Sequence, residues 1–393
     1  MSRHVVITAG VRTAIGTFGG ALSGHAPSEL GALVVGEALN RAGLPAAEVG
    51  HVVFGNVILT ESKDAYLARV AAIEAGIPVE VPAMTLNRLC GSGVQAIISA
   101  AQAIMLGDCD TAVAGGAETM SRAPHLLATA RFGQRMGDAV VADHLTGVLT
   151  DPFGNGIMGI TAENVAERYG IDREAQDTFA AESQRRAAEA IAAGRFKEQI
   201  LPVEVRKGRD TISFDTDEHP KPATTAETLK GLRPTFKKDG TVTPGNASGI
   251  NDGAAAMVLM EEGRASREGK PMLARLVGYA HAGVEPGVMG IGPVPAVQAL
   301  LKRTGLSLGD FDVIESNEAF AAQACAVAKE LGFDPGRVNP NGGAIALGHP
   351  VGATGAIITL KAAYELQRSG GRYGLVTMCI GGGQGIALAI ERA

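Results

Sequence analysis

The sequence predicts an α/β protein with two similar halves and a segment of different character inserted into it. Three observations support this prediction. Short apolar runs alternate with helix-like stretches early in the chain; prolines, charges and polar turns become frequent between Met120 and about Gly245; and a pattern from the first half returns near the end. At 393 residues the chain is also too long for most single hydrophobic cores.

The first half alternates strands with helices. Apolar runs with strand character occupy residues 5–8, 52–54 and 111–114, and helix-like stretches lie at 29–42, 65–75 and 93–106. This alternation predicts a largely parallel sheet that helices cover on both faces.

The inserted segment is expected to form a loop domain. A long helix is predicted from Asp172, a good N-cap residue, to Gly194, which suits the left-handed position after a helix. Residues 251–260 then have the character of a strand that returns to the first sheet.

The last third of the chain repeats the series of strands and helices seen in the first half. Residues 275–280 open a second series, and residues 354–363 (TGAIITLKAA) resemble residues 92–101 (SGVQAIISAA). If two duplicated halves pack about a pseudo-two-fold axis, the two helix N-termini meet in one central site. The expected division is therefore an N-terminal half (residues 1–120 with 246–271), an inserted loop domain (121–245) and a C-terminal half (272–393).

Composition excludes several classes of protein. The net charge is −6 and the pI about 5.8, whereas proteins that bind nucleic acid or anionic membranes are generally basic. No apolar run approaches the ~18 residues that span a bilayer, and the start of the chain lacks the features of a signal or transit peptide. Neither a nucleic-acid partner nor a membrane is expected.

The cysteine pattern indicates a reducing compartment. The four cysteines are far apart and show neither CxxC nor Cys/His zinc spacing, so neither a disulfide framework nor a metal site is expected. We therefore expect a cytoplasmic protein.

Cys90 is the first candidate for chemistry. It lies in NRLCGSG (residues 87–93), directly before a predicted helix, where unpaired amides favour a thiolate and can hold an oxyanion. The alternative is a small buried hydrophobic side chain, which free cysteines often are.

His349 and Asn317 are the next candidates. His349 lies in a glycine-rich loop, where an imidazole can take a proton from a thiol at neutral pH. Asn317 follows an apolar strand, where its amide can hold a water molecule or polarise a carbonyl. The alternative for His349 is a structural histidine in a loop, and the alternative for Asn317 is an N-cap of the next helix.

Cys379 ends the strand-like run LVTM and is followed by glycines 381–383, whose amides suit an oxyanion hole. From the residues alone it is a second nucleophile, a resolving thiol or a proton carrier. A thiol–disulfide oxidoreductase is disfavoured by the missing CxxC spacing and the nearby imidazole.

Four motifs together resemble one family. They are NRLCGSG (87–93), NEAFA (317–321), GHPVGATG (348–355) and CIGGG (379–383). In this order, over essentially the whole chain, they resemble the thiolases of the acetyl-CoA acetyltransferase and β-ketothiolase branch. The resemblance implies a five-layered αβαβα fold, a loop domain that binds coenzyme A, and a homotetramer (a dimer of dimers) or at least a dimer.

The resemblance also implies roles for five residues. Cys90 is implied as the acyl-accepting nucleophile and His349 as its base, while Cys379 takes a proton from the second acetyl-CoA. Asn317 is implied to hold a water that, with His349, stabilises the enolate. The amides of Cys90 and Gly381 are implied to hold the tetrahedral oxyanion.

The resemblance further implies which residues contact coenzyme A: Ser248, Lys221, Phe236, Leu149, Met158, Met289, Ala319 and Phe320. One departure concerns Ile157, because acetoacetyl-CoA-specific relatives commonly have His-Met where this chain has Ile157-Met158. The loss of a polar group there hints at a roomier apolar pocket.

The leading hypothesis is reversible condensation of two acyl-CoA molecules, or thiolytic cleavage of short-chain 3-ketoacyl-CoA, with acetyl-CoA, 3-ketoacyl-CoA and CoA as ligands. The alternatives are a ketoacyl synthase, which would lack a base of the Cys379 type, and a non-catalytic acyl-CoA or lipid carrier of the same fold. A subsidiary hypothesis is that Cys90 and Cys379 can oxidise to an inactivating disulfide.

Overall fold

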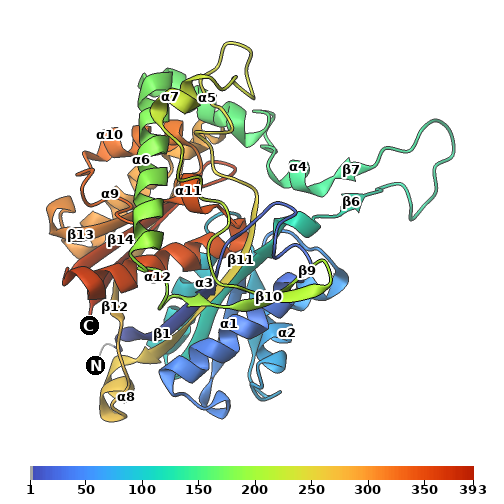
Figure 1. Ribbon diagram of the computed structural model, residues 1–393. Helices are drawn as coiled ribbons and strands as arrows, with labels where there is room; N and C mark the ends of the chain where they lie inside the picture. Colours follow the sequence, from blue (N-terminus) through green and yellow to red (C-terminus); the bar gives the residue numbers. More distant parts are fainter. Residues whose placement is uncertain (1–2) are drawn as a thin grey trace.

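A mixed sheet runs through the centre of the protein in the computed structural model, which describes residues 3–393 apart from the side chain of Lys207 (Figure 1). In the described residues the sheet has eleven strands, and its main path is β13-β14-β15-β12-β1-β11-β5-β3-β4. The strands of this path are β1 (Val5–Thr13), β3 (His51–Gly55), β4 (Ala83–Leu86), β5 (Thr111–Thr119), β11 (Asn251–Glu261), β12 (Ala274–Gly283), β13 (Phe311–Ser316), β14 (Tyr373–Ile380) and β15 (Gln384–Arg392).

The sheet confirms the predicted duplication. Each half contributes four strands to the repeated pattern. In the first half these are, in chain order, β1, β3, β5 and β11, and they lie side by side in the order β3-β5-β11-β1. In the second half the equivalent strands are β12, β13, β14 and β15, in the same spatial order, β13-β14-β15-β12. The two halves meet between β1 and β12 through two residue pairs, Val6 with Arg275 and Ile7 with Ala274.

The expectation of a largely parallel sheet is wrong. Neighbouring strands are parallel in β3–β4, β3–β5 and β13–β14, but antiparallel in β5–β11, β11–β1, β1–β12, β12–β15 and β15–β14. β14 and β15 are joined by a glycine turn at residues 381–383, and a short turn can only connect antiparallel strands. β11 takes the equivalent place beside β5.

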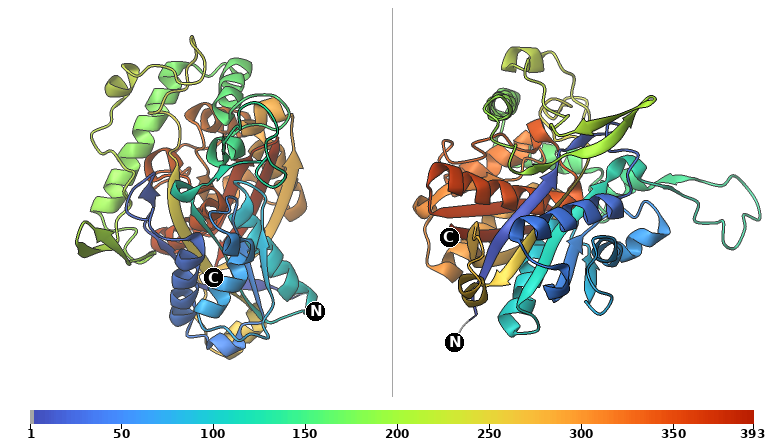
Figure 2. Two further views of the ribbon diagram at one scale, coloured as in Figure 1. Left: turned by 90° about the vertical axis from the view of Figure 1, so that its right-hand side faces the viewer. Right: turned by 60° about the horizontal axis from the view of Figure 1, so that its bottom comes forward.

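Helices complete five layers. α1 (Pro27–Ala42) and α2 (Leu67–Glu74) cover the first half of the sheet, and α9 (Pro293–Thr304) and α10 (Ala321–Leu331) lie on the other side of the molecule (Figures 1 and 2). Between the halves lie α3 (Ser92–Leu106) and α12 (Val351–Ser369), and α12 contacts strands of both.

The two central helices cross at equivalent glycines. A Cβ on Gly93 would overlap the backbone of Ala356, and one on Gly355 would overlap the backbone of Val94. Because only glycine lets two helix backbones approach this closely, the sequence echo marks the crossing point of the duplicated helices.

One earlier expectation about membrane spans needs correction. Residues 89–106, which include α3, are long and apolar enough to cross a membrane by length and composition. In the fold 56% of this window is buried, and α3 packs against α12, β3 and β5. Its apolar character therefore reflects a central helix covered by protein on both sides.

The segment between β5 and β11 carries most of the remaining elements. The helices are α4 (His144–Val148), α5 (Met158–Tyr169), α6 (Arg173–Ala192) and α7 (Ala226–Lys230), and the hairpins are β6 (His125–Leu126) with β7 (Ala142–Asp143) and β9 (Val203–Lys207) with β10 (Asp210–Phe214). Smaller elements are β2 (Gly16–Thr17), β8 (Ile200–Leu201), α8 (Glu262–Arg267) and α11 (Ala344–Leu347). The chain between β6 and β7 projects as an arm away from the body (Figure 1).

The predicted long helix is confirmed as α6. The Asp172 side chain accepts a hydrogen bond of 2.8 Å from the Ala175 amide, and Gly194 has φ +69° just beyond the helix.

A buried ion pair anchors the inserted segment to the sheet. Arg12 of β1 donates to both carboxylate oxygens of Asp217, at 2.7 and 2.9 Å, and neither side chain has any exposed surface. Asp217 also accepts the Ile15 amide at 2.8 Å, and the Arg12 guanidinium lies over the ring of Phe196. The charged stretch 214–222 is thus a structural attachment as well as a surface loop.

Candidate active site

The predicted catalytic residues lie at the ends of four central elements. Cys90 comes two residues before α3, His349 two residues before α12, Asn317 directly after β13, and Cys379 next to the end of β14, with Gly381 in the turn that follows. Because α3 and α12 cross and β13 pairs with β14, chain segments far apart in sequence meet here.

His349 is held as a neutral base with a defined tautomer. Its Nδ1 lies 2.7 Å from Oγ1 of Thr354, and the only proton of that hydroxyl is donated to the carbonyl of Pro350 at 2.9 Å. With the hydroxyl proton directed to that carbonyl, the hydroxyl oxygen accepts from Nδ1–H and the ring lone pair lies on Nε2, and we assign this tautomer. Burial lowers the pKa of His349 to about 4.

Asn251 holds the backbone of the same histidine. Its Oδ1 accepts the amide N–H of His349 at 2.9 Å, and its Nδ2 donates to the carbonyl of Gly16 at 3.0 Å. Gly348 adopts φ +107°, and a Cβ there would overlap the Asn251 side chain. Sequence reasoning did not find Thr354 or Asn251 as partners of His349, although Thr354 opens one copy of the internal echo.

Asn317 faces His349. Its Nδ2 lies 3.4 Å from Nε2 of His349, and its Oδ1 is buried with no hydrogen-bond partner among the described residues. The alternative that Asn317 caps the next helix is wrong, because α10 begins at Ala321 and its N-cap residue is Phe320. The amide is therefore free to bind an oxygen or a water molecule beside the imidazole.

Cys90 and Gly381 are in direct contact. The Gly381 amide donates a hydrogen bond to the Cys90 sulfur, which favours the thiolate, but burial outweighs it and raises the pKa of Cys90 to about 11. The expectation that the helix start keeps Cys90 ionised is therefore wrong for the unliganded site. Cys90 is half-buried and packs against an apolar cluster of Val57, Ile58, Met120, Leu145 and Val351.

Cys379 is the more deeply buried thiol. Its residue surface is 1% exposed, and it packs in one apolar cluster with Met158, Met289, Ala319 and Phe320. Burial raises its pKa, and the nearby Cys90 raises it further. Both thiols are therefore protonated at neutral pH until a partner removes the proton.

Most residues predicted to contact coenzyme A lie around these two thiols. Four of them form the cluster with Cys379. Phe236 stacks edge-on against Phe320 with ring centroids 6.3 Å apart, the Ser248 amide donates to the Ala319 carbonyl at 3.0 Å, and the Leu149 carbonyl accepts from the Met158 amide at 2.8 Å.

Lys221 and Ile157 lie at the edge of this group. Lys221 is exposed, and its backbone amide donates to Gln184 of α6 at 2.8 Å, so the structure does not place it within the cluster. Ile157 is the N-cap residue of α5, directly before Met158.

Glu118 is a buried carboxyl that sequence reasoning missed. It accepts hydrogen bonds from the Asn56 side chain and from the amides of Val57, Ile58 and Gly352, at 2.8–3.0 Å. Burial raises its pKa to about 8, while these donors favour the charged form. Its signal in the sequence is a lone acid within the small and apolar residues of β5. Through Gly352 it ties the first turn of α12 to the loop after β3.

Comparison with known proteins identifies the family. Residues 5–263 match the thiolase N-terminal domain and residues 270–392 match the thiolase C-terminal domain. The chain belongs to the thiolase family. It is therefore an acyltransferase, and the four motifs lie within the two matched ranges.

Individual thiolases resemble the chain over its full length. It is 62% identical to a beta-ketothiolase, BktB, of Cupriavidus necator, with 100% of both chains covered. Among solved structures, the acetyl-CoA acetyltransferase of Bacillus anthracis has a TM-score of 0.98 at 48% identity, with 100% of this chain and 99% of that chain covered. The human mitochondrial 3-ketoacyl-CoA thiolase in complex with CoA has a TM-score of 0.96 at 44% identity, with 100% and 98% covered.

Residues 3–393 contain no group of three or more His, Cys, Asp and Glu side chains that could hold a metal ion.

Proposed function

We propose that this thiolase interconverts short-chain 3-ketoacyl-CoA plus CoA with two acyl-CoA molecules through an acyl-enzyme on Cys90. The observations that support the proposal are two pairs of groups on elements that pack together. Cys90 and Cys379 are neighbouring protonated thiols, and His349 is a neutral imidazole beside the Asn317 amide, whose oxygen has no partner among the described residues. These groups support two successive proton transfers at one bound thioester.

In the first half-reaction Cys90 attacks the carbonyl carbon of an acyl-CoA. His349 takes the thiol proton on Nε2 as the sulfur–carbon bond forms, so no free thiolate needs to persist in the buried site. The amides of Cys90 and Gly381 hold the oxyanion. When the tetrahedral intermediate collapses, the carbon–sulfur bond to coenzyme A breaks. Cys379 gives its proton to the leaving thiolate, while His349 keeps the proton that it took from Cys90.

In the condensation direction a second acetyl-CoA enters. Cys379, now a thiolate, removes a proton from its methyl carbon, and protonated His349 with a water bound by Asn317 stabilises the enolate oxygen. The carbanion attacks the acyl carbon on Cys90, and the bond to the Cys90 sulfur breaks to release 3-ketoacyl-CoA. His349 then returns its proton to the Cys90 thiolate. Cleavage runs through the same steps in reverse, with coenzyme A as the final acyl acceptor.

The pKa directions suit this sequence. A base must be unprotonated and an acid protonated at the working pH, and burial produces both states by lowering the pKa of His349 and raising those of Cys90 and Cys379. Charge then appears only during the reaction, where the oxyanion amides are already in position.

The ligands follow from the family and from the apolar cluster. We infer acetyl-CoA, 3-ketoacyl-CoA and CoA as substrates and products, with no tightly bound cofactor. The predicted contacts Ser248, Phe236, Leu149, Met158, Met289, Ala319 and Phe320 surround the thiols, which suits a pantetheine arm. Ile157 beside Met158 adds apolar surface there, which favours substrates beyond acetoacetyl-CoA.

Three alternatives from the sequence are disfavoured by the site. A ketoacyl synthase does not use a second cysteine in the place of Cys379, and a carrier of acyl-CoA has no use for a neutral imidazole with an oriented tautomer. A thiol–disulfide oxidoreductase has no use for the apolar cluster around Cys379.

We propose a homotetramer that is located in the cytoplasm. The arm between β6 and β7 exposes Leu126, Leu127, Phe132, Met136, Val140 and Val141, which supports burial against another copy in a homotetramer. The four cysteines are free, which supports a reducing compartment such as the cytoplasm. We also propose the division into residues 1–120 with 246–271, 121–245 and 272–393.

Intact-mass analysis and kinetics test the reaction. Cys90→Ser should gain no acetyl group from acetyl-CoA, whereas Cys379→Ser should acylate but fail to exchange the methyl protons of acetyl-CoA with solvent. An acetylated Cys90→Ser protein would contradict the assignment. Cleavage rates over 3-ketoacyl-CoA of increasing chain length would establish the substrate range.

A further inference from the structure

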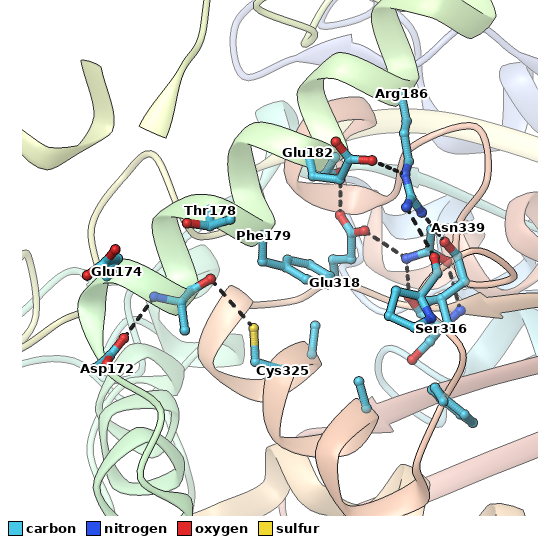
Figure 3. Close-up of a pocket in the computed structure, with 17 residues that line it drawn as sticks. Asp172, Glu174, Thr178, Phe179, Glu182, Arg186, Ser316, Glu318, Cys325 and Asn339 are labelled. Carbon is cyan, nitrogen blue, oxygen red and sulfur yellow. Dashed lines mark hydrogen bonds and ion pairs between the residues drawn. The ribbon is translucent and has the colours of Figure 1, made fainter. Parts of the chain in front are cut away.

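We propose that a cavity between α6 and α10 is a second ligand site, for a molecule with an apolar body and a hydrogen-bond-donating end such as an amine. The cavity has a volume of about 660 Å³, which lies within the usual range for small-molecule sites (Figure 3). Its lining includes Cys325 but neither Cys90, His349 nor Cys379, so it is distinct from the candidate active site.

The walls of the cavity are mainly apolar. α6 contributes Phe179, and α10 contributes Ala324 and Ala328, whose small side chains leave space between the two helices; Phe333 and Val338 line the side beyond α10. An apolar body placed here would lose its contact with water at little cost in polar desolvation.

Hydrogen-bonded polar groups line the buried end of the cavity. Glu318 accepts hydrogen bonds from the Ser183 hydroxyl at 2.6 Å and from the Asn339 side chain at 2.7 Å, and Asn339 also donates to the Ser316 carbonyl at 2.8 Å. Because these groups already satisfy one another, the deep end favours an apolar group of the ligand. Ser316 and Glu318 are the sequence neighbours of Asn317, the candidate catalytic amide.

The mouth of the cavity is lined by charged side chains. Asp172, Glu174 and Glu182 line it with Arg186, and Glu182 is paired with Arg186 at 2.7 Å while Asp172 caps α6. In the described residues Glu174 has no hydrogen-bond or ion-pair partner. Its carboxylate therefore suits an ammonium or hydroxyl donor, and it disfavours an anion such as an acyl-CoA.

Tryptamine is a suitable probe because the chain contains no tryptophan, so that indole fluorescence reports the ligand alone. We expect a saturable blue shift of its emission on titration with the full-length protein. Indole-3-propionate has the same ring and an anionic end, and it should bind at least ten times more weakly. Equal binding of the two, or no shift at millimolar protein, would overturn the proposal.

Two substitutions and the alkylation of one cysteine test whether tryptamine binds in this cavity. Ala328→Phe should abolish it by filling the cavity, while Ala192→Phe, at an exposed position at the end of α6, should leave it unchanged. Burial raises the pKa of Cys325 to about 12, so its alkylation by N-ethylmaleimide is slow, and tryptamine should slow it further without protecting Cys109. This protection is measured in the wild-type chain and does not depend on either variant folding. Displacement of tryptamine by acetyl-CoA, or retained binding in a folded Ala328→Phe protein, would refute this site.

Discussion

Replacing Thr354 by valine should impair His349 without removing it. Valine has nearly the shape of threonine but cannot accept the Nδ1–H that now lies 2.7 Å from Oγ1. A buried N–H left without a partner costs about 1–3 kcal/mol. The ring can avoid this cost by moving its proton to Nε2, the nitrogen that the mechanism needs unprotonated.

The expected result is a fall of roughly 5- to 150-fold in the rate of Cys90 acylation, since each 1.4 kcal/mol corresponds to about a factor of ten. Single-turnover acylation by acetyl-CoA, followed by mass, measures the step directly. Nitrogen-15 NMR of the imidazole should show a smaller share of the Nδ1–H tautomer. Thr354→Ser keeps the acceptor and should stay close to wild type.

A control separates this effect from damage to α12. Thr359 is buried on the same helix and donates to the carbonyl four residues earlier, at Gly355, but does not contact His349. Thr359→Val should therefore lose a comparable helix bond and keep its acylation rate. If Thr359→Val slows acylation as much as Thr354→Val, or if Thr354→Val acylates at the wild-type rate, the tautomer argument is wrong.

Three further predictions concern stability. The pKa of His349 is about 4 in the folded protein and 6.5 ordinarily, so between these pH values the unfolded chain binds more protons. The free energy of unfolding should therefore fall by up to about 3 kcal/mol as the pH drops through that window. Urea unfolding of the wild type compared with His349→Ala separates this dependence from the opposite contribution of buried carboxyls. Glu118→Gln should destabilise the protein by about 1–3 kcal/mol, because its amide N–H₂ would meet backbone donors; an unchanged melting temperature would contradict that geometry. Arg12→Met should cost about 3–5 kcal/mol by leaving Asp217 buried without its partner, and Arg12→Met with Asp217→Asn should recover part of that loss in a double-mutant cycle.

Local sequence patterns predicted local structure well. Asp172 and Gly194 bound a helix through hydrogen bonds and dihedral preferences that involve only nearby residues, and the structure confirms both ends. The echo between residues 92–101 and 354–363 also held, because the duplicated helices must bring their glycines together at the crossing. Such signals can be read from the sequence because each depends on a few adjacent residues.

Predictions that depended on long-range contacts were less successful. The antiparallel centre of the sheet depends on where β11 and β15 return, and strand polarity is not encoded in the strands themselves. Asn317 was assigned a possible capping role, but the helix begins later and leaves the side chain facing His349. The ionisation of Cys90 was misjudged because burial of a side chain depends on the whole fold.

The order of thiol, imidazole and amide motifs along this chain was sufficient to indicate its family and its acyl-transfer chemistry, because those residue types must be present for the reaction. Which of them are protonated, and which nitrogen of His349 is free, was decided only by tertiary structure. The pKa depends on burial, which the whole fold decides. The backbone of the histidine is held by Asn251, which is 98 residues from His349 in sequence and 2.9 Å from its amide in space.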